Sequence, residues 1–562
     1  APIFPVYNAD GSYNWDNNGY LRLEENGVGD TQFNETLNPV ALALEIDDVR
    51  ERLNMQGSVY ASYEFIDGLE YKITAGGDYY NYSRNYYRPS YIPLKNKANY
   101  KDPSNPTAKS ITNSYFHWTL SNQLSFSRRF GDHSLNAVAV WEAEKEHVKT
   151  SQIVGTGVKG DDKIRTTKGK TIDPEETYNN EYAYTFASWL VRAQYSYKGR
   201  YMVSASIRGD GSSRFAPNTR WGYFPAASVG WRMSDERFLR DVKWIDDLKI
   251  RASWGQTGNQ GISNSARYST YIADYGSDRL TSTAYDIYGV GSGIYPSGFR
   301  LSQTGGLDLK WETTTQTDIG LDFTLLDGSL YGTIDGYIKK IDDMLIQPGY
   351  LGSVGEGGYT WLNGPAMKTK GMEFLLGYRY TARSGFYLDL SANLDFFRSE
   401  VTYIPSTATG SYEHTNTELL IGHPYGARVG YVADGLFTSQ EQLDASNQPG
   451  KRLGGIRFRD FSGPDGVPDG EIDAWDRTWI YDPVPDFSYG INLSMAYKGF
   501  DFSMFWQGVA GVDVENVAKY QTDFWGVNDV GGNKGARLLD AWTPQNPGST
   551  IPAVSTINNG DE

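Results

Sequence analysis

The segment from Trp311 to Lys340 alternates apolar and polar residues in two opposite phases around a short turn. Odd positions are apolar before the turn and even positions after it, which is the two-residue period of strands with unlike faces. A two-residue turn at Asp327-Gly328 would place both apolar rows on one face. The segment therefore predicts a long β-hairpin. The pairs that this register implies are Leu325 with Leu330, Phe323 with Gly332 and Leu321 with Ile334.

Each half of the hairpin alternates for about ten residues, which is the length that a tilted strand needs to cross a bilayer and about twice that of a usual soluble strand. A large β-sandwich or solenoid accommodates such a hairpin as well, so strand length by itself leaves both classes open. The same alternation recurs along the chain in about seven hairpins, which makes roughly fourteen strands.

The connections between these strands separate the two classes. The pattern indicates short turns inside hairpins and loops of roughly thirty to ninety residues between them, as in outer-membrane barrels with tight periplasmic turns and long extracellular loops. A β-sandwich mixes connection lengths at both ends. We therefore predict an all-β fold, a transmembrane antiparallel β-barrel, to which this chain contributes about fourteen strands. The residues predicted to face a wet lumen, opposite the lipid-facing apolar row, are Asp318, Asp322, Asp335 and Lys339.

The predicted organisation has three parts. Residues 1–56 are rich in Asn, Asp, Gly and Pro, which indicates an extracellular loop region. Residues 57–508 carry the membrane-spanning strands with their long extracellular loops, and residues 509–562 form an extracellular loop leading to final strands that the chain lacks. The long connections predicted to lie outside the cell are 81–115, 143–183, 257–310, 341–370 and 398–486.

Composition argues against several classes of function. The chain has 562 residues and a formal net charge of -16, whereas phosphate binding calls for a basic groove, so we expect no nucleic-acid partner. The sequence contains no cysteine, and its five histidines show no zinc-binding helix pattern. It also contains no Gly-x-Ser-x-Gly elbow and no P-loop, so we expect no enzyme activity and no required cofactor.

One acidic segment has the residue types and spacing of a calcium site. Oxygen donors fall near positions 1, 5, 9 and 12 of an EF-hand-like loop, with Gly470 at position 6, although position 3 is Val467. Ca²⁺ prefers six to eight oxygen ligands, which these residues could largely supply. The alternative is an acidic turn on an extracellular loop. The candidate ligands are Asp465, Asp469, Asp473, Asp476 and the carbonyl group of Glu471.

A second candidate site is the short stretch Tyr359-Thr-Trp361-Leu-Asn363, which combines aromatic faces with an amide. Sugar or peptide recognition uses these groups, and loops above a lumen are where such contacts occur. The alternative is an aromatic girdle at the membrane interface. We therefore predict Tyr359, Trp361 and Asn363 as substrate-binding residues.

Several strings of the chain, in the same order, resemble the SusC/RagA-like TonB-dependent outer-membrane transporters. The resemblance covers essentially the whole chain. It implies a Gram-negative outer-membrane barrel of twenty-two strands with an N-terminal plug domain, on which TonB acts, and a SusD-like surface lipoprotein over the mouth. The strings are LKIRASWGQTGNQGI at 248–262, LDLKWETTTQTDIGLDF at 307–323, YIKKIDDML at 337–345, KGMEF at 370–374, DGEIDAWDR at 469–477 and PDFSYGINLSMAYKGFDFSMFWQGVAG at 485–511.

The chain departs from this family by omission, because it has no plug, no TonB-contacting segment and no family-typical final strands. We therefore expect a fragment or one part of a split or partly traced barrel. The resemblance implies active import of oligomeric nutrients, glycans or peptides, across the outer membrane. The alternatives are a passive porin and a surface β-rich binding or structural protein without a transport role.

Overall fold

The structure is a computed structural model that describes residues 5–14, 38–89, 106–158, 171–173, 176–272, 300–348, 359–405, 420–523 and 534–554. One large sheet dominates it. Its strands are β1 (Asp47–Ile66), β2 (Leu69–Arg88), β3 (Thr107–Phe130), β4 (His133–Thr156), β6 (Tyr178–Tyr197), β7 (Tyr201–Ser212), β8 (Trp221–Arg232), β9 (Ile245–Asn259), β12 (Glu312–Leu325), β13 (Leu330–Asp342), β17 (Ala366–Thr381), β18 (Tyr387–Tyr403), β23 (Phe487–Tyr497) and β24 (Phe500–Ala510), with β5 (Thr171–Ile172) beside the end of β4.

These fourteen main strands pair in chain order, and every neighbouring pair is antiparallel, which confirms the predicted strand number and class. The predicted register of the β12–β13 hairpin is also confirmed, because Leu325 pairs with Leu330 and Leu321 with Ile334. The turn between them has positive φ at Leu326, Asp327 (56°) and Gly328 (77°). Asp and Gly tolerate this conformation better than other residues do, which explains their place in the turn.

The strands extend beyond the predicted limits. β1 begins at Asp47 rather than Gly57, and the connection between β4 and β6 covers 157–177 rather than 143–183. The added segments lack alternation, as in DDVRERLNMQ at the start of β1. Strand ends that project past a bilayer have water on both faces, so no apolar row marks them in the sequence.

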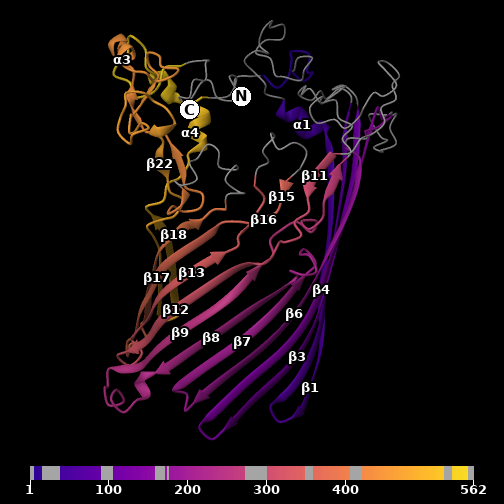
Figure 1. Cartoon of the computed structure of the whole chain (residues 1–562), viewed down its shortest axis with the longest axis vertical. Helices are drawn as coiled ribbons and strands as arrows, with labels where there is room; N and C mark the ends of the chain where they lie inside the picture. Colours follow the sequence, from indigo (N-terminus) through magenta and orange to yellow (C-terminus); the bar gives the residue numbers. More distant parts are fainter. Residues whose placement is uncertain are drawn as a thin grey trace.

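The two ends of the sheet differ in their connections, as Figure 1 shows. Tight turns lie at the lower end, and the long connections lie at the upper end, which we call the mouth. Two connections depart from the predicted pattern. Residues 213–220 form a short connection at the mouth, and residues 233–244 form a longer one at the turn end that includes the 3₁₀ helix η2 (Met233–Asp235).

Small sheets and helices lie at the mouth, in the long connections and in the segments before β1 and after β24 (Figure 1). The small sheets are β10 (Thr270–Ile272) with β11 (Arg300–Thr304) and β15 (Tyr359–Thr360), β14 (Leu345–Ile346) with β16 (Leu362–Asn363), β19 (Arg428–Gly430) with β22 (Thr478–Tyr481), and β20 (Ala433–Leu436) with β21 (Ile456–Phe458). The helices are α1 (Pro39–Glu45), α3 (Gln440–Ala445) and α4 (Val517–Asp523), with the 3₁₀ helices η5 (Ala474–Asp476) and η6 (Ala536–Asp540).

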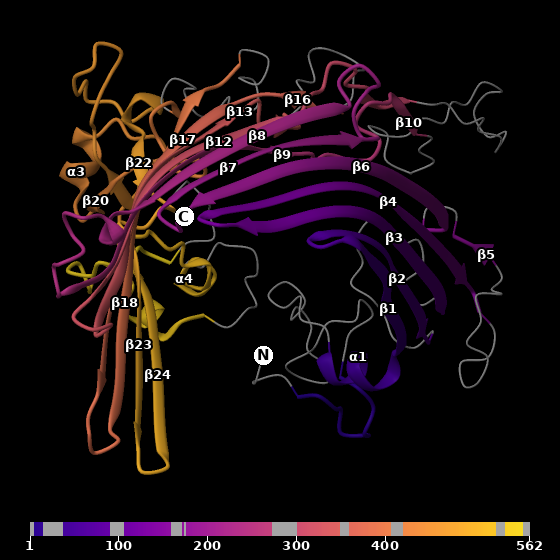
Figure 2. The same ribbon diagram turned by 90° about the horizontal axis from the view of Figure 1, so that it is seen from below.

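The main sheet curls into an incomplete ring (Figure 2). β1 and β24 stand at its two ends, and each has a paired neighbour on one side only among the strands that the structure describes. The sheet is therefore the wall of a barrel that these strands do not close. Among the described helices, none combines the length and apolar character that crossing a membrane requires.

Candidate functional site

The outer face of the sheet carries a continuous apolar surface. Cross-strand pairing aligns Ile250, Leu321, Ile334 and Phe374 in one row over four strands. Large side chains on this face stay exposed, among them Ile319, of which 59% is accessible. A soluble protein rarely leaves so extended an apolar face uncovered. A surface of this kind is suited to contact with lipid.

The opposite, inner face carries polar side chains that meet across several strands, as expected on the concave side of a curled sheet. Arg251 of β9 bonds to three carboxylates of β12 and β13. Its Nη1 donates to Asp318 Oδ1 (3.2 Å), its Nε to Asp322 Oδ1 (3.1 Å) and its Nη2 to Asp335 Oδ2 (2.7 Å). Lys249 Nζ adds a bond to Asp322 Oδ2 (2.9 Å). The predicted lumen face thus holds a linked charge network.

Gly320 makes this network possible. It lies on β12 between Arg251 of β9 and Asp335 of β13, in register with both. A Cβ atom at this position would lie 2.3 Å from Asp335 Oδ1 and 2.5 Å from Arg251 Cζ. The glycine therefore leaves the gap through which the guanidinium group crosses β12 to reach a strand two positions away.

A second polar cluster lies on the inner face of β2 to β6. His117 is placed between two carboxylates, with Nδ1 at 3.5 Å from Asp78 Oδ2 and Nε2 at 3.4 Å from Glu144 Oε2. The Tyr184 hydroxyl group donates to Glu144 Oε1 (3.4 Å). Aromatic rings and carboxylates therefore alternate on this part of the wall. Such a surface can bind polar solutes through stacking and hydrogen bonds.

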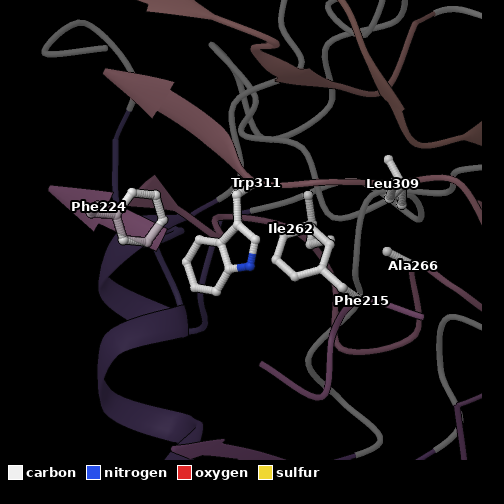
Figure 3. Close-up of a cluster of buried hydrophobic side chains, with 6 residues drawn as sticks. All are labelled: Phe215, Phe224, Ile262, Ala266, Leu309 and Trp311. Carbon is white, nitrogen blue, oxygen red and sulfur yellow. The ribbon is translucent and has the colours of Figure 1, made fainter. Parts of the chain in front are cut away.

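An apolar cluster lies where the connections meet the inner face near the mouth (Figure 3). At its centre the Trp311 ring contacts Phe224 of β8 edge-on (centroids 5.6 Å apart) and Phe215 (5.2 Å), and its Nε1 donates to the Arg220 carbonyl oxygen (2.9 Å). The cluster fixes the mouth-end connections to the wall. Its buried members are Phe215, Phe224, Ile262, Ala266, Leu309 and Trp311.

Two of the three predicted substrate residues, Trp361 and Asn363, lie beside this cluster. Trp361 is partly buried against it, and the Asn363 amide bonds to backbone atoms of Lys310 and Asp343. Asn363 Oδ1 accepts from Lys310 N, while Nδ2 donates to the carbonyl oxygens of Lys310 and Asp343, each at 2.9 Å. Tyr359 begins β15. These contacts are those of residues that hold connections together, and substrate binding by the three residues stays a prediction.

The acidic loop is held together by its own backbone amides. Asp476 is fully buried, and its carboxylate accepts from Phe461 N (2.7 Å) and Ser462 N (3.2 Å), as well as from Asp473 N (2.9 Å). Burial by itself raises the pKa of Asp476, but these amide donors outweigh it and hold the pKa below its usual value. Asp476 and Asp473 form a reciprocal cap on η5.

The other predicted calcium ligands do not converge in this arrangement. Asp469 Oδ1 accepts from Glu471 N (3.0 Å), and the side chains of Asp465 and Glu471 are exposed. In the described part of the chain, no three His, Cys, Asp or Glu side chains are grouped so as to hold a metal ion. Calcium binding by the loop stays a prediction.

The sequence analysis missed Arg251 and Lys249 as members of the inner-face network. A signal was present, because both lie between the apolar residues Leu248, Ile250 and Ala252, which mark the other face of the strand. That alternation predicts the face of each cation. It does not identify the carboxylates that each cation contacts.

An apolar outer face, a charged inner face and long connections at one end define this sheet as part of a transmembrane β-barrel wall. The family described as TonB dependent receptor-like, beta-barrel, matches residues 3–550. The chain belongs to this family, whose members are β-barrels of the outer membrane.

Individual relatives agree with this assignment. TonB-dependent receptor P3 of Formosa agariphila is 29% identical over 578 residues, covering 98% of this chain and 52% of the relative. TonB-dependent receptor SusC of Bacteroides thetaiotaomicron is 31% identical over 327 residues, covering 57% of this chain and 30% of the relative. The chain thus spans about half the length, or less, of these curated relatives.

A solved structure of the RagAB peptide transporter has the same fold. It matches with a TM-score of 0.77 and 21% sequence identity, covering 98% of this chain and 57% of that chain. The likeness therefore extends over almost the whole of this chain.

Proposed function

We propose that this chain forms part of the wall of a TonB-dependent importer that carries an oligomeric nutrient across the outer membrane. The observation that carries the proposal is the inner face, where charged and aromatic side chains line a wall whose outer face is apolar. Family membership supports the same reading. The proposed nutrient is either a glycan or a peptide.

The proposal extends to a plug domain and to partner proteins. A plug inside the barrel would couple the importer to TonB, and a SusD-like surface lipoprotein would lie over the mouth. The incomplete ring supports a requirement for more protein, because unpaired strand edges are not tolerated in lipid. We also propose that the barrel has no enzyme activity of its own.

The test uses the full-length protein in its native host. Cells are given labelled oligosaccharides or peptides, and uptake is compared between wild type, a deletion of this protein and cells lacking TonB. We expect uptake to require both proteins, and the receptor to co-purify with a surface lipoprotein.

Two other results would overturn the proposal. Uptake that persists without TonB and follows the concentration gradient would identify a passive porin. Binding at the cell surface with no uptake under any condition would identify a binding or structural protein.

A further inference from the structure

A cavity of about 530 Å³ lies at the mouth, between the ends of β17 and β18 and the segment around β19. Met367 of β17 pairs with Val401 of β18, and the same ladder places Glu373 opposite Asp395. Glu373 also pairs with Asp335, which belongs to the inner-face charge network. The four positions on β17 and β18 have the same parity along their strands, so the cavity lies on the inner face of the sheet. We call it the rim pocket. Its main apolar lining residues are Met344, Met367, Val401, Ile404, Leu420 and Val429.

The described lining of the rim pocket is mostly apolar, and its charged side chains are all cationic. Among the described residues that line it are aliphatic side chains, one tyrosine and two arginines, and none of these described residues is Asp, Glu, Asn or Gln. A sugar needs hydrogen-bond acceptors for its hydroxyl groups, and unpaired hydroxyl groups in an apolar pocket cost free energy. An aliphatic or aromatic side chain meets no such cost. The lining therefore favours an apolar group over a sugar ring.

The two arginines at the pocket are held by aromatic rings. Arg428 lies over the Tyr481 ring (5.2 Å from the centroid), and its Nη1 is 2.8 Å from Glu515 Oε2. Arg477 lies over the Tyr431 ring (5.4 Å). Guanidinium groups donate several hydrogen bonds and bind carbonyl and carboxylate oxygens. In a chain with a net charge of -16, this is a place suited to an oxygen-rich anionic or carbonyl group beside an apolar one.

We propose that the rim pocket binds an apolar side chain of a peptide, with a peptide carbonyl or terminal carboxylate group directed to Arg428 or Arg477. A peptide joins these two groups through a single Cα atom, which fits a pocket whose apolar lining adjoins guanidinium groups. The position on the inner face at the mouth places the pocket on the path into the lumen. This inference rests on the proposed import function and specifies peptides as its substrate class.

The test compares two purified full-length variants that carry the same substitution on one strand. Met367→Trp fills the rim pocket, whereas Met372→Trp adds the same ring to the outer face of β17, where Met372 is 49% exposed. The probes are the pentapeptides Gly-Gly-Leu-Gly-Gly and Gly-Gly-Ser-Gly-Gly, with maltoheptaose and laurate as the comparison ligands. Affinity is measured by calorimetry.

We expect wild type to bind the leucine peptide roughly tenfold or more tightly than the serine peptide, because burying a leucine side chain is worth at least that factor. Met367→Trp should abolish this preference, and Met372→Trp should keep it. If Met367→Trp does not fold, Ala427→Phe fills the same pocket from its other wall.

Equal affinity for the two peptides in wild type, or a preference that survives filling of the pocket, would overturn the inference. The inference would also be overturned if wild type binds neither peptide but binds maltoheptaose or laurate, and if Met367→Trp removes that binding. The importer proposal is judged separately, by TonB-dependent uptake in cells. A protein that imports glycans but ignores both peptides keeps the importer function and loses the peptide pocket.

Discussion

At the scale of single residues, the inner face depends on one cation shared by three carboxylates. Arg251 can serve all three because its planar group donates in several directions at once, which a lysine ammonium group cannot do with the same geometry. Its reach to Asp335 depends on the missing side chain at Gly320. A glycine that is easily taken for a weak point in a strand therefore has a defined structural role.

Two glycines of one hairpin test this role. Gly320→Ala should lower the free energy of unfolding by about 1–3 kcal/mol, because its methyl group would displace Arg251 or Asp335. Gly336→Ala should be neutral or slightly stabilising, since a Cβ atom there meets nothing within 4 Å. Urea unfolding of the full-length protein in detergent measures both. Equal effects at the two positions would show that the gap at Gly320 is unimportant.

At the scale of elements, the β12–β13 hairpin shows how alternation and turn act together. The turn sets the register, and the register places Leu321 beside Ile334 on the outer face and Asp322 beside Thr333 on the inner face. A slip of one residue would exchange the two faces. The mouth-end connections are held instead by the apolar cluster around Trp311 and by side-chain bonds to the backbone, such as those of Asn363, and show no two-residue alternation.

Arginine substitutions at two adjacent positions of β13 test the faces of the hairpin. Ile334→Arg should cost about 2–4 kcal/mol if the residue lies near the bilayer midplane, because the charge would face lipid. Thr333→Arg should cost much less, since its cross-strand partner on the inner face is Asp322. Unfolding of the two variants in lipid vesicles gives the comparison. A larger loss for Thr333→Arg would reverse the assignment of the faces.

The acidic loop Asp465–Asp476 is predicted to bind Ca²⁺. If Asp465–Asp476 binds Ca²⁺, a chelator should lower the thermal stability of the loop in wild type, and Asp469→Asn with Asp473→Asn should remove that response. Isothermal calorimetry with Ca²⁺ measures binding directly. In the alternative, the carboxylates serve only the backbone amides that they contact in the structure, and wild type would ignore the chelator.

At the scale of the whole molecule, the sheet is a curved wall with two open edges. Among the described strands, β1 and β24 each pair with a neighbour on one side only, and a backbone group left unpaired in hydrocarbon costs several kcal/mol. We therefore expect β1 and β24 to pair with further strands in the membrane. The long connections and their small sheets lie at one end of the wall (Figure 1), so the molecule has a defined direction across the bilayer.

Protease sites inserted at the two ends test this direction. A site placed after Gly466, in the exposed acidic loop, should be cut when protease is added to intact cells expressing the full-length protein. The same site in the Lys498-Gly499 turn should be protected until the outer membrane is opened. Cleavage of the turn alone in intact cells would invert the proposed topology.

The residue pattern alone predicts the fold class, the approximate number of strands and the register of the Trp311–Lys340 hairpin. These properties are local, since a two-residue period with a short turn fixes which residues of neighbouring strands share a face. The Trp311–Lys340 segment contains its own register, and the lengths of the connections along the rest of the chain distinguish the fold class. The family resemblance added an expectation of partners and of a larger barrel.

The contacts between inner-face groups and the full length of the strands become apparent in the folded structure and not in the residue pattern. Arg251 meets Asp335 across an intervening strand, and Asn363 bonds to Lys310, contacts that join residues far apart in the chain. The alternation of residues along one strand does not predict contacts between residues far apart in the chain. The alternation of apolar and polar residues also stops where both faces of a strand contact water, as at the start of β1 at Asp47, because no apolar row is required there.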